Sequence, residues 1–120
     1  MAFDYSNSQV LFDNNFMPFT DANLNIASSP VLYGLTIYTV FSLNWNEHKK
    51  QLYAFRLREH YERLVNSARI MDFGQFIDEW DFKKFEQSML ELIRRNDIKE
   101  DALVRVAVYV DELVAGTKIH

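Results

Sequence analysis

The feature that most limits the fold is a change in apolar spacing near the middle of the chain. Before residue 55, β-branched and aromatic residues run in continuous stretches, which favour strands. Between positions 57 and 71 the apolar residues instead recur every three or four positions, at Leu57, Tyr61, Leu64, Ala68 and Met71. Such spacing places one apolar stripe along a helix. The chain must therefore combine helices and strands that cover one another's apolar faces.

Three segments are expected to form strands. Residues 31–43 (VLYGLTIYTVFSL) carry apolar side chains on both faces, so we expect this strand to be covered on both sides. A polar loop at 44–50 separates it from a short strand at 51–55, which predicts a hairpin. Residues 102–110 (ALVRVAVYV) place their valines on one face and Leu103, Arg105, Ala107 and Tyr109 on the other.

A second helix is predicted over residues 81–95, with an apolar stripe made of Phe82, Phe85, Met89, Leu92 and Ile93. Asp78 or Asp81 would cap its start, and Arg94 and Arg95 suit its C-terminal end. The predicted fold class is therefore α+β, a small antiparallel-type sheet with two helices packed on it.

The N-terminal residues 1–30 are rich in Asn, Ser and Asp and contain scattered aromatics, which predicts an irregular arm packed on the rest. We expect a short strand at Leu24–Ile26 and a turn at Ser28–Pro30. Residues 31–120 would form one small domain. The last residues leave a strand without a closing element, so we expect the chain to be cut before a second domain.

The composition excludes several classes of function. The net charge of -4, with both signs interspersed, argues against a nucleic-acid partner. The chain has no cysteine, so disulfides, thiolate metal sites and a cysteine nucleophile are impossible. Three glycines cannot build a glycine-rich phosphate loop, and three scattered histidines lack metal-ligand spacing. With no membrane-spanning run and no signal peptide at the start, we expect a cytoplasmic protein and no membrane partner.

The first helix carries a second, polar stripe beside its apolar one, made of Arg56, His60, Arg63 and Ser67. A cation at the border of a core is well placed to meet an anion in a cleft. The alternative is that Arg63 pairs with Glu59 one turn earlier on the same helix. The spacing alone leaves both interpretations open.

Residues 55–68, FRLREHYERLVNSA, resemble the FRLxxHxxRLxxSA segment of fold-type-IV enzymes that use pyridoxal 5'-phosphate (PLP). This family includes branched-chain aminotransferases, D-amino-acid aminotransferases and aminodeoxychorismate lyases. LYGLTIYTV at 32–40 resembles the family's YGDGVYEV or YGTSVFEG strand, and ALVR at 102–105 resembles a family strand that carries an arginine. The resemblance extends over roughly residues 20–112 and implies the family's N-terminal domain.

The resemblance implies several site residues. Arg63 matches the arginine that grips the cofactor phosphate, and His60 would help to place the helix. Tyr38 matches an aromatic residue of the substrate pocket, and Tyr33 matches a tyrosine that reaches the partner subunit's site. Arg105 matches an arginine near the substrate carboxylate. For the two tyrosines the alternative is ordinary strand packing.

The chain departs from the family pattern at Leu35, Thr39 and Val40, where the family usually has Asp or Thr, Glu, and a small residue. The resemblance therefore does not imply which amino acid is the substrate. The family's Schiff-base lysine lies in the second domain, and none of the six lysines here matches it. We therefore expect no catalytic residue in this chain and no transaminase activity from it alone.

The resemblance thus implies the N-terminal part of a homodimeric PLP aminotransferase that moves an amino group between an amino acid and a 2-oxo acid. One alternative is an aminodeoxychorismate-lyase-like PLP enzyme. Another is a non-catalytic interaction or dimerisation module derived from the same fold.

Overall fold

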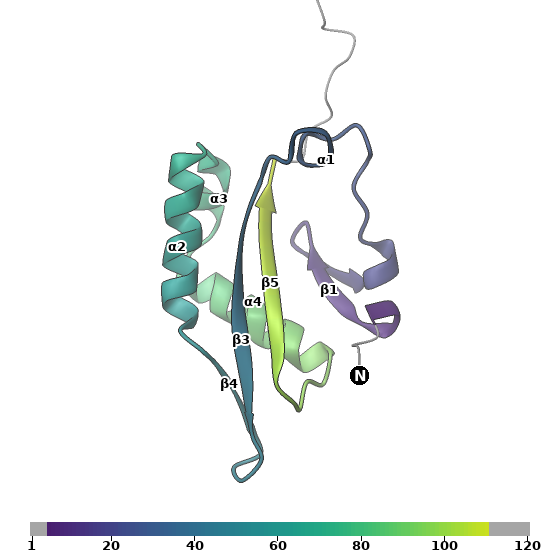
Figure 1. Ribbon diagram of the computed structural model, residues 1–120, viewed down its shortest axis with the longest axis vertical. Helices are drawn as coiled ribbons and strands as arrows, with labels where there is room; N and C mark the ends of the chain where they lie inside the picture. Colours follow the sequence, from purple (N-terminus) through teal and green to yellow (C-terminus); the bar gives the residue numbers. More distant parts are fainter. Residues whose placement is uncertain (1–4, 111–120) are drawn as a thin grey trace, which may run out of the picture.

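The computed structural model describes residues 5–110 and confirms the α+β fold class (Figure 1). Two small antiparallel sheets and the helices lie in this range, in the order η1 (Tyr5–Asn7), β1 (Gln9–Phe12), β2 (Asn15–Pro18), η2 (Phe19–Asp21), α1 (Ser29–Tyr33), β3 (Thr36–Asn46), β4 (Gln51–Ala54), α2 (Leu57–Ile70), α3 (Gly74–Glu79), α4 (Phe82–Arg95) and β5 (Ala102–Tyr109).

The larger sheet has the order β4–β3–β5, and both pairings are antiparallel. β5 pairs with β3 from Thr36 to Leu43, whereas β4 pairs only with the far end of β3, from Leu43 to Asn46. Residues 36–42 therefore have no strand neighbour on the β4 side within the described chain. In Figure 1, α2 lies beside this part of β3. The predicted hairpin is confirmed, although its first strand continues to Asn46 and shortens the loop.

The core lies between the sheet and the two long helices. Phe41 of β3 and Phe85 of α4 are each 1% exposed, and their ring centroids are 6.5 Å apart. Tyr61 of α2 packs against Phe85 at 5.0 Å. Burying one large apolar side chain stabilises the fold by about 1.5–3 kcal/mol, so this aromatic group anchors both helices. Both predicted stripes are confirmed in outline, but α2 ends at Ile70 and Met71 is 42% exposed.

Asp81 settles how α4 begins. Its carboxylate accepts a hydrogen bond from the backbone N–H of Lys84 at 2.7 Å, so Asp81 rather than Asp78 caps the helix. Asp78 lies in α3, a short helix that we did not expect.

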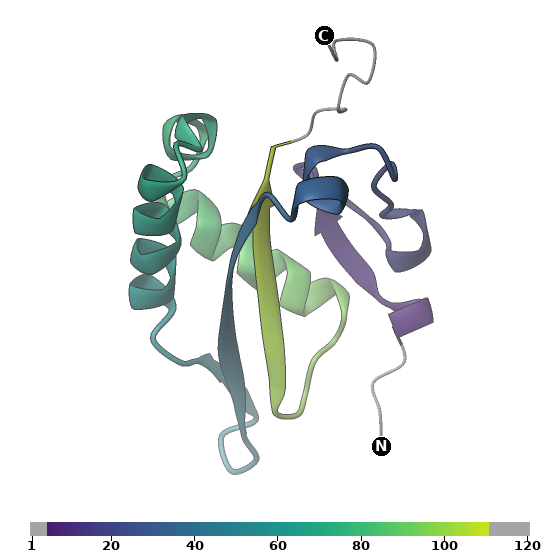
Figure 2. The same cartoon turned by 45° about the horizontal axis from the view of Figure 1, so that its top comes forward.

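The opposite face of the sheet is open, which contradicts the expectation that the first strand is covered on both sides. Tyr38 is 66% exposed and Leu103 is 73% exposed. The physical reason is that α2 and α4 both pack on the other face, while the N-terminal hairpin lies beyond β5 (Figure 2). Within the described residues, large apolar side chains on this face are therefore exposed to solvent.

The N-terminal arm is more regular than we expected. β1 and β2 form a hairpin whose turn places Asp13 and Asn14 at φ 51° and 65°, the conformation that tight hairpin turns require. Asn96 at the end of α4 clamps this hairpin: its side chain accepts from the Gln9 N–H at 2.8 Å and donates to the Gln9 carbonyl at 2.9 Å. Each strand has only four residues, too few to show the apolar alternation on which strand prediction depends.

Three local predictions were wrong. Ser29 and Pro30 begin the helix α1 and do not form a turn. Leu24–Ile26 is not a strand. Residues 31–33 belong to α1 rather than to the following strand, because Pro30 suits the first turn of a helix and Gly34 ends it in the left-handed conformation, at φ 66°. In residues 5–110, no helix combines the length and apolar character that crossing a bilayer requires.

Candidate functional site

The candidate site lies along the flank of α2 that borders β3. Tyr61, Leu64 and Ala68 are buried and orient the helix, so the neighbouring Arg63 is placed at the boundary between core and solvent. The sequence folds this way locally because the apolar stripe has to face the sheet. Arg63 is exposed, and it lies next to the part of β3 that does not pair with β4.

Thr39 joins β3 to α2 through polar contacts. Its side chain points to the helix-covered face and is fully buried, at 0% exposed. The Arg63 guanidinium donates to the Thr39 hydroxyl oxygen at 3.1 Å, and the same hydroxyl lies 3.0 Å from Nδ1 of His60. Three polar side chains from two elements thus form one hydrogen-bonded group, the Thr39 cluster (Thr39, His60 and Arg63).

A small hollow of about 160 Å³ opens beside this cluster, lined by Arg56, Glu59, His60 and Arg63. Arg56 precedes α2 in the left-handed conformation, at φ 53°, and its Nε lies 3.3 Å from a carboxylate oxygen of Glu59. With His60 neutral, the lining carries two positive charges and one negative charge. A small anion such as a phosphate group fits this charge and the donor groups of the guanidinium ions.

These contacts contradict the interpretation in which Arg63 pairs with Glu59. In the described residues Glu59 pairs with Arg56, and the hydrogen-bond partner of Arg63 is the Thr39 hydroxyl. A guanidinium carries five N–H groups, so Arg63 keeps most of them for water or a ligand. Its charge is held in place by a neutral group and not cancelled by a carboxylate.

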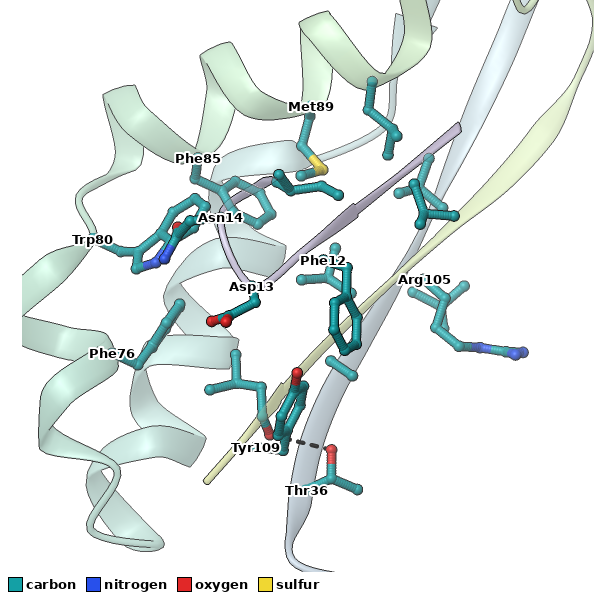
Figure 3. A pocket seen from close by; sticks show the side chains of 18 of the residues that line it. Phe12, Asp13, Asn14, Thr36, Phe76, Trp80, Phe85, Met89, Arg105 and Tyr109 are labelled. Carbon is teal, nitrogen blue, oxygen red and sulfur yellow. Dashed lines mark hydrogen bonds between the residues drawn. The ribbon is translucent and has the colours of Figure 1, made fainter. Parts of the chain in front are cut away.

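Tyr38 and Arg105 lie together on the other face of the sheet. Side chains alternate along a strand, so Tyr38 points away from the face that Thr39 occupies. Val40 pairs with Arg105 and Tyr38 pairs with Ala107, which makes Tyr38 and Arg105 diagonal neighbours. Figure 3 shows the Arg105 side chain directed away from the apolar residues around β5. An arginine in an otherwise apolar strand needs a partner when it is buried. Arg105 is exposed instead, and no ion pair to it occurs within residues 5–110.

Tyr33 is the last residue of α1 and is 64% exposed. Gly34 then turns the chain into β3, so Tyr33 lies near the start of that strand. The hollow beside Arg63 is lined by none of the other three predicted site residues. The structure therefore brings Tyr38 and Arg105 to one face, and leaves Arg63 on the helix side of β3.

A larger cavity, of about 1290 Å³, lies between the N-terminal hairpin, β5 and α4 (Figure 3). Its walls are mainly apolar and include Phe76, Phe85 and Met89. The charged residues among its lining, Asp13, Glu79 and Arg105, belong to three different elements and make no ion pair with one another. Its charged groups therefore do not form the set of convergent polar groups that typically fixes a ligand in an apolar pocket.

Sequence reasoning treated Thr39 only as a departure from a family pattern and missed its contacts. A signal was available: alternation places this hydroxyl among Ile37, Phe41 and Leu43 on a buried face, where a polar group needs a partner. Among residues 5–110, no three His, Asp or Glu side chains are grouped so that they could hold a metal ion.

Comparison with known proteins adds a second line of evidence. No protein-family model matches the chain. The chain is 28% identical over 116 residues to a probable branched-chain-amino-acid aminotransferase of Aquifex aeolicus. This match covers 96% of the chain and 36% of that protein.

Solved structures show the same similarity. The branched-chain aminotransferase of Thermoproteus uzoniensis with norvaline matches with a TM-score of 0.74 at 26% identity, over 89% of this chain and 34% of that one. The PLP form of the branched-chain amino acid aminotransferase from Thermobaculum terrenum matches in fold with a TM-score of 0.75 at 19% identity. That match covers 88% of this chain and 34% of the other. The chain thus spans about a third of the length of these relatives. On this evidence the chain is homologous to the N-terminal portion of branched-chain aminotransferases.

Proposed function

We propose that this chain is the N-terminal, cofactor-facing part of a PLP-dependent aminotransferase that resembles the branched-chain enzymes. The complete enzyme would move an amino group between an amino acid and a 2-oxo acid. The observation that carries the proposal is the Thr39 cluster, which holds an uncancelled Arg63 charge in a chain homologous to these enzymes.

Arg63 is the residue that would hold the cofactor phosphate. Its guanidinium is always charged and offers paired N–H groups that match phosphate oxygens. It borders the hollow together with Arg56, so the residues present fit a phosphate group. When bound, PLP supplies an electron-accepting ring that stabilises negative charge on the amino-acid carbon. This chain would bind the phosphate and orient the cofactor.

Tyr38 and Arg105 would form one wall of the substrate site. Their shared face is exposed in the described chain, so it is available to a second domain. Arg105 has no carboxylate partner within residues 5–110, which leaves its charge for a substrate carboxylate. Tyr33, exposed at the end of α1, would reach towards the partner subunit's site.

The proposed organisation has an arm at residues 1–30, a small domain at 31–120, and a further C-terminal domain that supplies the catalytic lysine. The working enzyme would be a cytoplasmic homodimer. Because no lysine of this chain matches the catalytic one, the chain alone would be inactive.

The test reconstitutes the chain with the second domain encoded downstream of residue 120, and measures PLP binding by absorbance and amino transfer to a 2-oxo acid. A hydrogen bond to a charged group contributes about 1.5–3 kcal/mol, so Arg63→Ala should weaken PLP binding roughly 10- to 150-fold. Arg58→Ala is the matched control, because Arg58 lies on the same helix but stacks 4.0 Å over Phe82.

Equal PLP affinity in the Arg63→Ala and Arg58→Ala proteins would contradict the role of Arg63. A stop codon directly after residue 120, with no gene for a second domain, would contradict an aminotransferase role altogether. That second result would favour a non-catalytic interaction module, for which the exposed face around Tyr38 and Leu103 offers a surface.

A lyase-like PLP enzyme shares the fold and the cofactor. Val40, on the same strand face as Tyr38, departs from the aminotransferase pattern, so this wall of the substrate site differs from that pattern. Product analysis of the complete enzyme separates the two: transfer of the amino group to a 2-oxo acid identifies an aminotransferase, and cleavage of the substrate without an amino acceptor identifies a lyase.

A further inference from the structure

Thr39 is buried among apolar side chains, yet it is the residue through which β3 contacts the polar flank of α2. It is 0% exposed and lies between Ile37 and Phe41 on the core-facing side of the strand. A buried hydroxyl is costly unless its donor and acceptor are both used. In the described residues, its two side-chain partners are Arg63 at 3.1 Å and His60 at 3.0 Å.

The chemistry of these partners and the burial of Thr39 give the direction of both hydrogen bonds. A guanidinium can only donate, so the Thr39 oxygen accepts from Arg63. If this oxygen also accepted from an Nδ1–H of His60, its buried hydrogen would have no side-chain acceptor within the described residues, so the hydroxyl donates to the lone pair of Nδ1. A neutral imidazole with an unprotonated Nδ1 carries its proton on Nε2. The Thr39 hydroxyl therefore selects one tautomer of His60.

The same hydroxyl orients Arg63 without cancelling its charge. The carboxylate one turn earlier on α2, that of Glu59, is paired with Arg56 at 3.3 Å. Arg94 and Arg95, by contrast, both pair with Glu91. A neutral anchor leaves the guanidinium available to an anion in the hollow.

We propose that Thr39 is a positioning residue for anion binding: its hydroxyl orients the Arg63 guanidinium and holds His60 as the neutral Nε2–H tautomer. An anion that reaches His60 from the hollow then meets an N–H donor rather than a lone pair. The anion has the chemistry of a phosphate group, free or carried by a cofactor. This inference rests on the proposed function only in identifying that anion with the PLP phosphate.

The first measurement needs no ligand. Nitrogen NMR of the His60 ring in the chain as it stands reports which ring nitrogen carries the proton. We expect a protonated Nε2 and an unprotonated Nδ1 in the unmodified protein. A protonated Nδ1 would overturn the proposal, because the Thr39 hydroxyl could not then donate to it.

The second measurement uses variants. Thr39→Val removes the hydroxyl at nearly constant size, and Thr39→Ser keeps it. We expect Thr39→Val to mix the two tautomers of His60 and to broaden the Arg63 Nε–H signal, and Thr39→Ser to restore both. Thr36→Val is the matched control, since Thr36 lies on the same strand but its hydroxyl donates to the Val108 carbonyl at 3.1 Å. Unchanged His60 and Arg63 signals in Thr39→Val would refute the proposal. If Thr39→Val does not fold, the tautomer in the unmodified protein still decides.

The third measurement titrates inorganic phosphate while the Arg63 Nε–H signal is followed. The affinity should fall roughly three- to tenfold in Thr39→Val, the ratio expected for one weakened hydrogen bond, and should recover in Thr39→Ser. Equal affinities in all three proteins would count against positioning.

The outcomes separate this inference from the proposed function. If PLP binding in the reconstituted enzyme does not depend on Arg63 while the tautomer and phosphate results hold, only the assignment of the anion to PLP fails. If PLP binding depends on Arg63 but Thr39→Val leaves the tautomer and the Arg63 signal unchanged, only the role of Thr39 fails.

Discussion

Replacing Asn96 with alanine should release the N-terminal hairpin from α4 while leaving the main core intact. The Asn96 side chain makes two hydrogen bonds to Gln9, at 2.8 and 2.9 Å, across 87 residues of sequence. A third bond, to the Leu92 carbonyl at 2.9 Å, keeps the amide in place at the end of the helix. Within residues 5–110 no sheet ladder joins β1 to β5, so this clamp ties the hairpin to α4 without the help of strand pairing.

The size of the effect follows from these bonds. Each typical intramolecular hydrogen bond contributes about 0.5–1.5 kcal/mol, so losing two costs about 1–3 kcal/mol. That cost raises the opening equilibrium of the hairpin roughly 5- to 150-fold. Phe12 against Tyr109, at 6.3 Å, and Arg95 over Phe16, at 4.4 Å, remain and keep the open state in the minority.

Native-state hydrogen exchange is the direct assay, because the Gln9 amide donates to Asn96 itself. Its protection should fall by the factor above, whereas amides in β3 should keep theirs. Asn66→Ala is the control, because Asn66 is an exposed residue of α2 away from the hairpin. An unchanged Gln9 exchange rate, or an equal loss of protection in β3, would refute the view that this clamp acts locally.

Further predictions concern the core and the helix cap. Burial, and secondarily the charge of Asp81, raise the pKa of Tyr61. The stability that the neutral phenol contributes is therefore complete below about pH 10 and is lost as the pH rises through the raised pKa. Tyr61→Phe should flatten the alkaline fall in unfolding free energy, and parallel curves of unfolding free energy against pH for the two proteins would contradict this. Asp81→Ala should cost about 0.5–2 kcal/mol in urea unfolding, and Asp78→Ala much less. Phe85→Ala should lower the free energy of unfolding by about 3–5 kcal/mol, which for a domain of this size lowers Tm by roughly 10 °C or more. Leu90→Ala, at an exposed position of the same helix, should change Tm little.

Periodicity along single elements was enough to predict the two long helices, the central hairpin and the last strand. The stripe from Leu57 to Ala68 depends only on the geometry of one helix, so it can be read without knowing what covers it. The same reasoning placed Arg63 on the flank of that stripe. Apolar spacing did not predict β1 and β2, because four residues are too few to establish a period of two. The apolar residues 31–33 favoured a strand, although Pro30 and Gly34 are the start and stop signals of the helix α1.

Which faces meet was decided only by the tertiary structure. Residues 38 and 39 are adjacent, yet Tyr38 is 66% exposed and Thr39 is 0% exposed, because both long helices pack on one side of β3. The partners of Thr39 lie 21 and 24 positions away on α2, and the clamp of Gln9 lies 87 positions away. The sequence by itself determined which residues share a helix stripe or a strand face. Contacts across such separations depend on how the elements pack, which no local pattern encodes, so only the folded chain could show that Arg63 is held by a neutral hydroxyl rather than by Glu59.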